Sequence, residues 1–318
     1  MKIIIVGAGM AGLVAANMLR RHEVTVIEKS SRLPHNHTAL LRFRTTAVSD
    51  VTSIPFKKQQ VLKGLWDGKQ VINKPTLAHI NRYSANVTDG ELHQRSILNM
   101  EPAQRWVAPA EFIELMAKNL DIHFGVSFDF STRIQRQTYA PETTPIISTV
   151  PMPFLMGEFG WKDRPEFKFK PVWTIKATLV KPVSSICQTI YNTEPLEWYR
   201  TTIHGQQLTI EYMFDPETIC DNLLHEASET FDRFFNDNQH CDSIIQDAQV
   251  NKIGIGKIRP IDEAVRKRFM LWLTEKFSVY SLGRFATWRN ILLDDVVQDV
   301  KKIEAMIESG STYEMRKA

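Results

Sequence analysis

Residues Met1–Gly12 read MKIIIVGAGMAG, and residues Val24–Glu28 read VTVIE. An apolar run leads into the motif G-x-G-x-x-G, a segment rich in Ala and Leu follows, and a second β-branched run ends in an acid. This order predicts a strand, a helix and a second strand that form a dinucleotide-binding βαβ unit. Gly7 permits the tight turn after the strand, Gly9 lets the backbone approach a pyrophosphate, and Gly12 lets the helix pack on the strand.

The same unit supplies the first set of predicted cofactor contacts. Glu28 follows the glycine motif by about 20 residues, where a carboxylate accepts the hydroxyls of a ribose. The motif alone does not separate NAD from FAD. The residues that we expect to contact the cofactor from this unit are Gly7, Ala8, Gly9, Met10, Ala11, Gly12, Glu28 and Lys29.

Composition indicates an ordinary globular chain with room for a full core. The chain has 318 residues, 43% of them hydrophobic, and a net charge of +3, so no large field of one sign directs it to nucleic acid. The three widely spaced cysteines, Cys187, Cys220 and Cys241, favour a reducing compartment and argue against a disulfide framework or a metal site. The apolar runs are too short to span a bilayer and the N-terminus lacks a signal peptide's features, so we expect a cytoplasmic protein.

The middle of the chain alternates between strand and helix patterns. Residues 122–126 and 145–151 are predicted as further strands of the first sheet. Between residues 54 and 98, short alternating runs broken by Asp67-Gly68 and Asp89-Gly90 predict a small inserted β element. Residues 167–212 predict an antiparallel sheet with a hairpin at residues 204–206. Amphipathic helices are expected from Pro109, over residues 217–235 and from about Asp262.

The C-terminal segment, residues 279–297, predicts a strand that ends in Gly283-Arg284, a loop, and a helix that opens behind Asp294 and Asp295. If this helix start faces the cofactor, free backbone N–H groups near residues 295–297 would stabilise the negative charge of a reduced flavin. The alternative is an ordinary capped terminal helix.

The loop after Glu28 is the second place where we expect chemistry. It leaves the carboxyl edge of the predicted sheet, where open α/β sheets hold ligands, and it carries His35, His37, Arg42 and Arg44. The alternative is a surface loop whose arginines extend along apolar surface into water. No zinc site is expected from the two histidines, because no further ligands stand at usable spacing. The candidate catalytic residues are Arg42, Arg44, His37, Trp288 and Asn290, and no metal ligand is predicted.

Three motifs together resemble a known superfamily. Gly7–Gly12 with Glu28, the strand and turn at residues 146–151, and the run from Leu282 to Trp288 are similar to the FAD superfamily of amine oxidases, protoporphyrinogen oxidase and UDP-galactopyranose mutase. The resemblance implies FAD as the cofactor, with Val126 at the adenine and the last Gly-Arg loop and helix at the pyrophosphate and flavin. The cofactor contacts it adds are Val126, Thr149, Gly283, Arg284, Asp295 and Val296.

The chain also departs from that superfamily. It is shorter than typical amine oxidases, and residues 34–37, Pro-His-Asn-His, replace the glycine pair usually found after the ribose acid. More narrowly, residues 39–44 and 281–290 resemble compact flavoproteins encoded by bacteriophages, some of which act on amino-acid-modified thymine in DNA hypermodification.

The resemblance and the spacing together give the expected fold class. We expect an α/β fold with a Rossmann-like FAD-binding domain and an interleaved antiparallel-sheet substrate domain (α+β). The expected FAD-binding domain spans residues 1–45, 100–150 and 279–318, and the expected substrate domain spans 46–99 and 151–278.

Missing motifs narrow the function. The sequence has no C-x-x-C, no second G-x-G-x-x-G, since Gly254-Ile255-Gly256 runs into Lys257, and no Gly-Asp dipeptide. These absences disfavour a flavin disulfide reductase, a separate NAD(P)H domain and an aromatic hydroxylase. Two kinds of flavoenzyme remain: one that receives electrons directly from its substrate, and one that uses flavin without net redox.

Three functions stay open. The first is oxidation of a C–N bond in an amine by hydride transfer to flavin N5; the second is a flavin-dependent mutase acting on a nucleotide sugar; the third is a non-enzymatic FAD-stabilised binding protein. Expected partners are a small amine or a modified nucleobase, and no membrane. DNA is suggested by the basic and aromatic residues of 167–176, although an edge strand whose lysines block aggregation explains the same pattern. The electron acceptor and the oligomeric state stay open.

Overall fold

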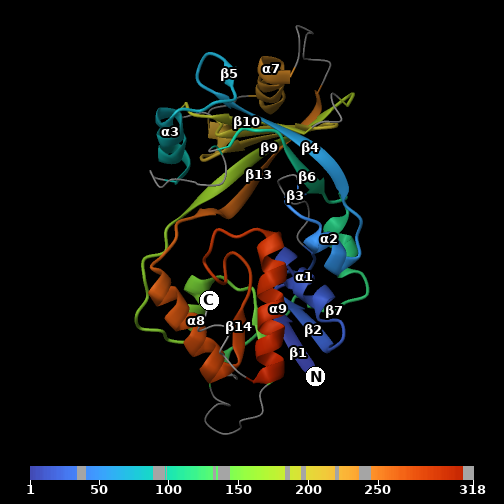
Figure 1. The fold of residues 1–318 in the computed structure, drawn as a ribbon, viewed down its shortest axis with the longest axis vertical. Helices are drawn as coiled ribbons and strands as arrows, with labels where there is room; N and C mark the ends of the chain where they lie inside the picture. Colours follow the sequence, from blue (N-terminus) through green and yellow to red (C-terminus); the bar gives the residue numbers. More distant parts are fainter. Residues whose placement is uncertain are drawn as a thin grey trace.

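The computed structural model describes residues 1–33, 41–88, 97, 99–131, 134, 144–182, 187–194, 198–218, 222–235 and 245–310. Two sheets organise this part of the chain, one above the other in Figure 1. The predicted α/β class is confirmed. His37 and the expected turn at Asp89-Gly90 lie outside the described residues. None of the described helices is both long and apolar enough to cross a bilayer.

A five-stranded parallel sheet contains the N-terminus. Its order is β14-β8-β1-β2-β7. The strands predicted at residues 122–126 and 145–151 are therefore β7 and β8, and they lie in the same sheet as β1 and β2. Both faces of the central strand are covered, which explains why its sequence is an unbroken apolar run. The strands are β1 (Lys2–Val6), β2 (Glu23–Glu28), β7 (Asp121–Phe124), β8 (Ile146–Ser148) and β14 (Val279–Ser281).

Helices cover both faces of this sheet. The face of Ile3 and Ile5 packs against α1 (Met10–Met18), α2 (Ala47–Thr52), α4 (Phe112–Ala117) and α9 (Leu293–Ser309). The face of Ile4 and Val6 packs against α6 (Met152–Glu158) and α8 (Glu263–Phe277). Asp262 caps α8 as expected, because its carboxylate accepts a hydrogen bond from the Val265 amide at 2.9 Å.

The second sheet has nine strands in the order β13-β9-β12-β11-β10-β4-β6-β3, with β5 paired to β4. Its pairs are antiparallel except for β10 with β4, and the predicted hairpin at Gly205 joins β11 to β12. The strands are β3 (Arg42–Phe43), β4 (Lys57–Trp66), β5 (Val71–Ile72), β6 (Ala103–Val107), β9 (Phe169–Leu179), β10 (Cys187–Asn192), β11 (Arg200–His204), β12 (Gln207–Tyr212) and β13 (Ile245–Ile258).

The two faces of the second sheet differ in character. One face packs its apolar side chains, such as Ile175 and Ala177, against α7 (Leu223–Phe235), which lies on the outer side of the sheet in Figure 1. Because side chains alternate along a strand, Thr174 and Lys176 point to the opposite face, toward the five-stranded sheet. The strand pattern therefore directs polar residues toward the nucleotide-binding part of the fold. A 3₁₀ turn (Pro216–Thr218) precedes α7.

Two expected secondary-structure elements are corrected. Residues Leu77–Thr88 form a helix, α3, rather than short strands; its buried residues Ile80, Tyr83 and Val87 recur at helical spacing and pack beneath β4 and β10. The helix expected from residue 217 begins at Leu223 instead. Asn222 accepts hydrogen bonds from the amides of residues 224 and 225 there, and so caps the helix.

Strand pairing also differs from expectation. The strand β9 lies between β12 and β13, so the lysines of residues 168–176 do not protect a sheet edge. Residues 42–43 and 103–107, which we grouped with the nucleotide domain, pair in the second sheet, and α8 packs on the first. The division into two domains stays a prediction.

The close approach of Gly283 to Ala11 gives a stability prediction. Gly283 has φ +89°, and a Cβ built on it would lie 2.8 Å from the Ala11 Cβ. Gly283→Ala should lower the free energy of unfolding by about 1–3 kcal/mol, measured by urea unfolding of the cofactor-free protein. Gly310→Ala is the control, because Gly310 also has positive φ (+63°) but no described atom within 4 Å. Equal losses in the two variants would contradict the close approach.

Candidate functional site

The glycine motif forms a narrow loop between β1 and α1. Gly7 has φ +104°, and a Cβ there would lie 2.1 Å from Thr149 Oγ1; a Cβ on Gly12 would lie 2.0 Å from the Gly7 carbonyl oxygen. A Cβ on Gly9 would meet no described atom within 4 Å. Packing therefore requires two of the glycines, while the third borders open space of the kind that a pyrophosphate needs.

The start of α1 presents backbone donors to that space. Gly9 is the N-cap residue and has no side chain to cap the helix, and the Leu13 amide makes the first bond back to the Gly9 carbonyl, at 3.0 Å. The amides of Met10, Ala11 and Gly12 precede that bond, so they are the helix's free donors. This arrangement fits an anionic group at the helix N-terminus.

The predicted ribose acid is held in place by backbone amides. One carboxylate oxygen of Glu28 accepts a hydrogen bond from the Ala8 amide at 2.7 Å, and the other accepts one from the Ser30 amide at 2.8 Å. Val126 lies beside it: its amide donates to the Glu28 carbonyl at 3.0 Å, and its side chain is exposed. The remaining lone pairs of the carboxylate are free for ribose hydroxyls, and Val126 offers an apolar surface next to them. Lys29 is exposed, and its contact with the cofactor stays a prediction.

The Gly-Arg loop after β14 returns to the same place. Gly283 packs on Ala11, and its carbonyl accepts the Thr287 hydroxyl at 2.7 Å. Arg284 donates to the Asn290 side-chain oxygen at 3.3 Å, while its Nε is buried and has no hydrogen-bond partner among the described residues. Burial lowers the pKa of Arg284. A buried guanidinium with an unsatisfied N–H beside the glycine loop is suited to a bound anion, so the residues present fit a dinucleotide.

The start of α9 differs from the sequence expectation. The amides of Asp295 and Val296 both donate to the Leu292 carbonyl, at 3.0 and 3.2 Å, and Asp295 accepts the Leu292 amide at 2.8 Å. The free amides therefore belong to Leu293 and Asp294, ahead of the expected residues 295–297. Val296 is 2% exposed and contributes packing.

Trp288 is also corrected. It is 1% exposed, its indole N–H donates to the Arg259 carbonyl at 2.8 Å, and its ring packs edge-on against Phe167 with the centroids 4.9 Å apart. With no exposed face it cannot stack on a flavin or a base. Its place is in the core, where it holds the loop after Gly283.

The inward face of the second sheet carries a group of basic residues. Arg42 on β3 donates to the Thr189 hydroxyl at 2.8 Å, and cross-strand register puts Lys63 and Arg105 on the same face. Burial lowers the pKa of Lys63, and the charges of Arg105 and Arg42 lower it further. Because neighbouring cations raise each other's energy, this basic face favours an anionic ligand.

The two predicted arginines thus occupy neighbouring positions rather than one site. Arg44 is exposed, and its backbone amide donates to the Asp294 carboxylate at 3.1 Å. Burial lowers the pKa of Arg105, and the charges of Arg44 and Arg42 add to the effect. Both arginines therefore act electrostatically on Arg105, Arg42 from β3 and Arg44 from the residue just after this strand.

A buried charge cluster near Arg284 was missed by sequence reasoning. Tyr199 donates its hydroxyl to Glu211 at 2.9 Å, and Arg200 makes a two-pronged contact with the same carboxylate. The Lys257 ammonium lies 4.8 Å from the centre of the Tyr199 ring. The register of β13 shifts between Ile253 and Lys257, and Lys257 pairs with Lys170 of β9. The one sequence signal was the glycine-rich interruption just before Lys257, which is typical of a bulged strand.

The cluster gives Lys257 an unusual charge state. Burial, together with the charges of Arg200 and Arg284, lowers the pKa of Lys257 to about 7, while Glu211 opposes the shift. Burial also works against the charge of Glu211, yet Arg200 holds the pKa of that carboxylate below its ordinary value. Glu211 is therefore neutralised mainly by Arg200, and Lys257 is free to lose its proton near neutral pH.

Comparison with known proteins agrees with this geometry. Residues 5–36 match the family described as an NAD(P)-binding Rossmann-like domain. No curated protein matches the chain. Among solved structures, reduced UDP-galactopyranose mutase has a TM-score of 0.69 at 13% identity, covering 98% of this chain and 95% of that one.

Two further structures are similar over most of their length. An oxidoreductase from Methanosarcina mazei has a TM-score of 0.58 at 10% identity, with 96% of this chain and 100% of that chain covered. The p-nitrophenol 4-monooxygenase PnpA from Pseudomonas putida DLL-E4 has a TM-score of 0.55 at 12% identity, with 98% and 82% covered. These likenesses show the fold, which this chain shares with a mutase, an oxidoreductase and a monooxygenase.

The open space at Gly9 allows a direct test of cofactor binding. Gly9→Glu should fold but lose FAD, because the carboxylate would enter the pyrophosphate path; FAD released on denaturation is the measurement. Gly9→Ala is the control and should keep most of the FAD, since its methyl group meets no described atom within 4 Å. Stoichiometric FAD in Gly9→Glu would contradict the placement of the site.

Proposed function

We propose that the protein is an FAD-dependent oxidoreductase that oxidises a C–N bond of an amine substrate. The observation that carries the proposal is the partly buried Lys257, with a pKa of about 7, next to Arg284 of the cofactor loop. A base of this pKa, on the sheet face that looks toward the nucleotide site, suits a reaction in which a proton must leave a substrate at neutral pH.

The proposed chemistry needs the amine in its neutral form. Bound FAD would supply the acceptor for a hydride from the carbon next to the nitrogen, and water would then hydrolyse the imine product. An ammonium group has no lone pair to assist that loss, so a nearby base must take its proton. Lys257 is the candidate base, with Tyr199 and Arg200 setting its environment, and Arg284 would bind the cofactor's anionic part.

The basic sheet face indicates that the substrate also carries a negative group. Arg42, Lys63 and Arg105 lie together on that face. Lys176 lies on the same face, four strands from Lys63. A narrower proposal follows from the resemblance to phage flavoproteins: the amine is borne by an amino-acid-modified thymine in DNA or in a nucleotide. Phosphates would then pair with the basic face while the amine reaches Lys257.

The same basic face favours a second candidate. A mutase acting on a nucleotide sugar would bind its diphosphate through these cations and would use the flavin without net redox. This candidate does not call for a base of pKa near 7 next to the cofactor loop, which is why we place it second.

Flavin absorbance distinguishes the two candidates. The oxidised holoenzyme should bleach without oxygen when mixed with the right member of a panel of amines, including modified nucleosides and oligonucleotides. Bleaching by an amine supports the first candidate. Turnover of a nucleotide sugar that requires prior chemical reduction of the flavin, with no bleaching by any amine, would support the second.

The pKa of Lys257 predicts the pH dependence of the reaction. Since the neutral amine is the active form, kcat/KM for flavin reduction should rise as pH increases through about 7 and then level off. Lys257→Met should remove this limb and lower kcat/KM by about 100-fold or more at pH 8. Lys252→Met is the control, because Lys252 lies on the same strand but packs over Trp173, a residue of the α7 side. A limb near pH 7 that survives in Lys257→Met would rule out this base.

The nucleic-acid proposal predicts a salt dependence. Binding of a single-stranded oligonucleotide should weaken steeply between ~50 and ~200 mM salt, with a slope of about −0.7 per phosphate contact. Lys63→Ala and Arg105→Ala should each flatten the slope by about that amount. Lys58 lies on the same strand as Lys63 but on the opposite face of the sheet, so Lys58→Ala should leave the salt slope unchanged. Binding that is independent of salt would leave the DNA proposal without support.

A further inference from the structure

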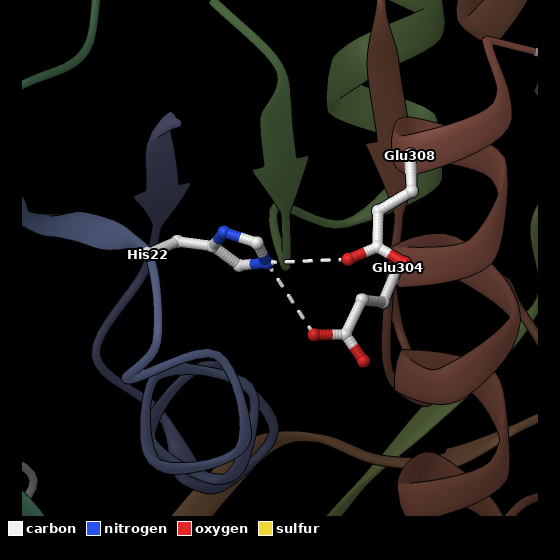
Figure 2. Close-up of side chains that lie close together, drawn as sticks. All are labelled: His22, Glu304 and Glu308. Atoms are coloured by element: carbon white, nitrogen blue, oxygen red, sulfur yellow. Dashed lines mark ion pairs between the residues drawn. The ribbon is translucent and has the colours of Figure 1, made fainter.

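A second cluster of titratable side chains lies far from the cofactor loop. His22 stands in the short turn between α1 and β2, at the amino edge of the five-stranded sheet, where its amide donates to the Leu19 carbonyl at 2.8 Å. Glu304 and Glu308 lie one turn apart on α9. Figure 2 shows the His22 ring directed at both carboxylates.

The distances within this cluster suit a shared ligand. The His22 Nε2 lies 3.4 Å from a Glu304 oxygen and 3.9 Å from a Glu308 oxygen (Figure 2). All three ligand atoms lie within 4.8 Å of one another. Two tetrahedral ligands that are each about 2.1 Å from a zinc ion are about 3.4 Å apart, so small side-chain rotations would complete the arrangement.

The state of His22 is the independent observation that points to a ligand. Its side chain is only 9% exposed, and its Nε2 is buried without a hydrogen-bond partner in the described part of the chain. Buried ring nitrogens are normally satisfied, by protein, water or metal. This nitrogen instead faces two carboxylate oxygens across a gap.

The charge on α9 adds to the case. Glu304 and Glu308 repel each other at this spacing, and they stand near the negative end of the helix dipole, where the last turn has no basic residue. Arg21 contacts both carboxylates, but its side chain is 59% exposed and such pairs contribute little. Arg21 is therefore a replaceable partner, and it leaves the buried His22 nitrogen unsatisfied.

We propose that His22, Glu304 and Glu308 bind a divalent transition-metal ion such as Zn²⁺. One imidazole nitrogen and two carboxylate oxygens are ligands that zinc accepts, with water in the fourth position. The bound ion joins the α1–β2 turn to the C-terminal half of α9, so its role is to hold this helix on the sheet. The site stands apart from the proposed reaction and does not depend on it.

The test uses the full-length holoenzyme, freed of metal with EDTA and transferred to chelator-free buffer. Zn²⁺ alone is titrated by calorimetry, and the melting temperature is measured with and without it. We expect one equivalent to bind and the melting temperature to rise by a few degrees at about 100-fold excess over Kd. His22→Ala and Glu308→Gln should each weaken binding by roughly 10-fold or more.

Two control variants make the result decisive. His225→Ala removes a histidine that pairs with Glu229 at 3.4 Å but is 65% exposed, and it should bind zinc like the unmodified protein. Arg21→Ala frees the two glutamates, so zinc affinity should stay the same or increase. Zinc binding that is equal in the unmodified protein and in His22→Ala, or no change in melting temperature with zinc, would overturn the proposal. If Arg21→Ala lowers stability and zinc does not restore it, the cluster is only an ion-pair network of Arg21 with the two glutamates. This result would also overturn the zinc proposal.

Discussion

The contact between Gly283 and Ala11 is the constraint on which the rest of the site depends. It joins the loop after the last strand to the first turn of the first helix, at a separation that leaves no room for a Cβ. Parallel pairing of β14, β8, β1 and β2 places the ends of all four strands at one edge, so the glycine motif, Thr149, Glu28 and the Gly-Arg loop converge there. A side chain at Gly283 would therefore push this loop away from α1.

The second sheet supplies what the nucleotide fold lacks. One face packs its apolar residues against α7, and the other face carries both an apolar cluster packed against α3 and polar residues such as Thr174 and Lys176. On that face Arg200 and Glu211 neutralise each other, which leaves Lys257 as a partly buried lysine without a full counter-charge. The result is a lysine with a lowered pKa beside the cofactor loop and a separate group of cations around Arg105.

Much of the nucleotide fold could be predicted because its signals are local. Gly7, Gly9 and Gly12 have roles set by spacing within one turn, and Glu28 follows at the distance that the βαβ unit imposes. The prediction that Trp288 is a catalytic residue was wrong, because the sequence places an aromatic residue after the loop but does not determine the direction of its ring. The free amides at the start of α9 are at residues 293–294 rather than 295–297, because the Leu292 carbonyl accepts hydrogen bonds from both Asp295 and Val296.

The residues that sequence reasoning missed depend on contacts between distant segments. Lys257 becomes a candidate base only when β11, β12 and β13 bring Arg200 and Glu211 near it. His22 and Glu304 stand at opposite ends of the chain, and nothing in their spacing indicates that α1 and α9 pack side by side. The central place of β9 in its sheet likewise follows from pairing and not from its own alternation of lysines and aromatic residues.

The central claim is that both ends of the chain form one FAD site, and hydrogen exchange with and without FAD tests it most directly. Amides that contact or close over a ligand exchange more slowly when it is bound. The account predicts that FAD slows exchange together in residues 7–12 and in residues 283–290, with residues 245–258 protected less. Protection confined to residues 7–12, with exchange in 283–290 unchanged, would contradict it.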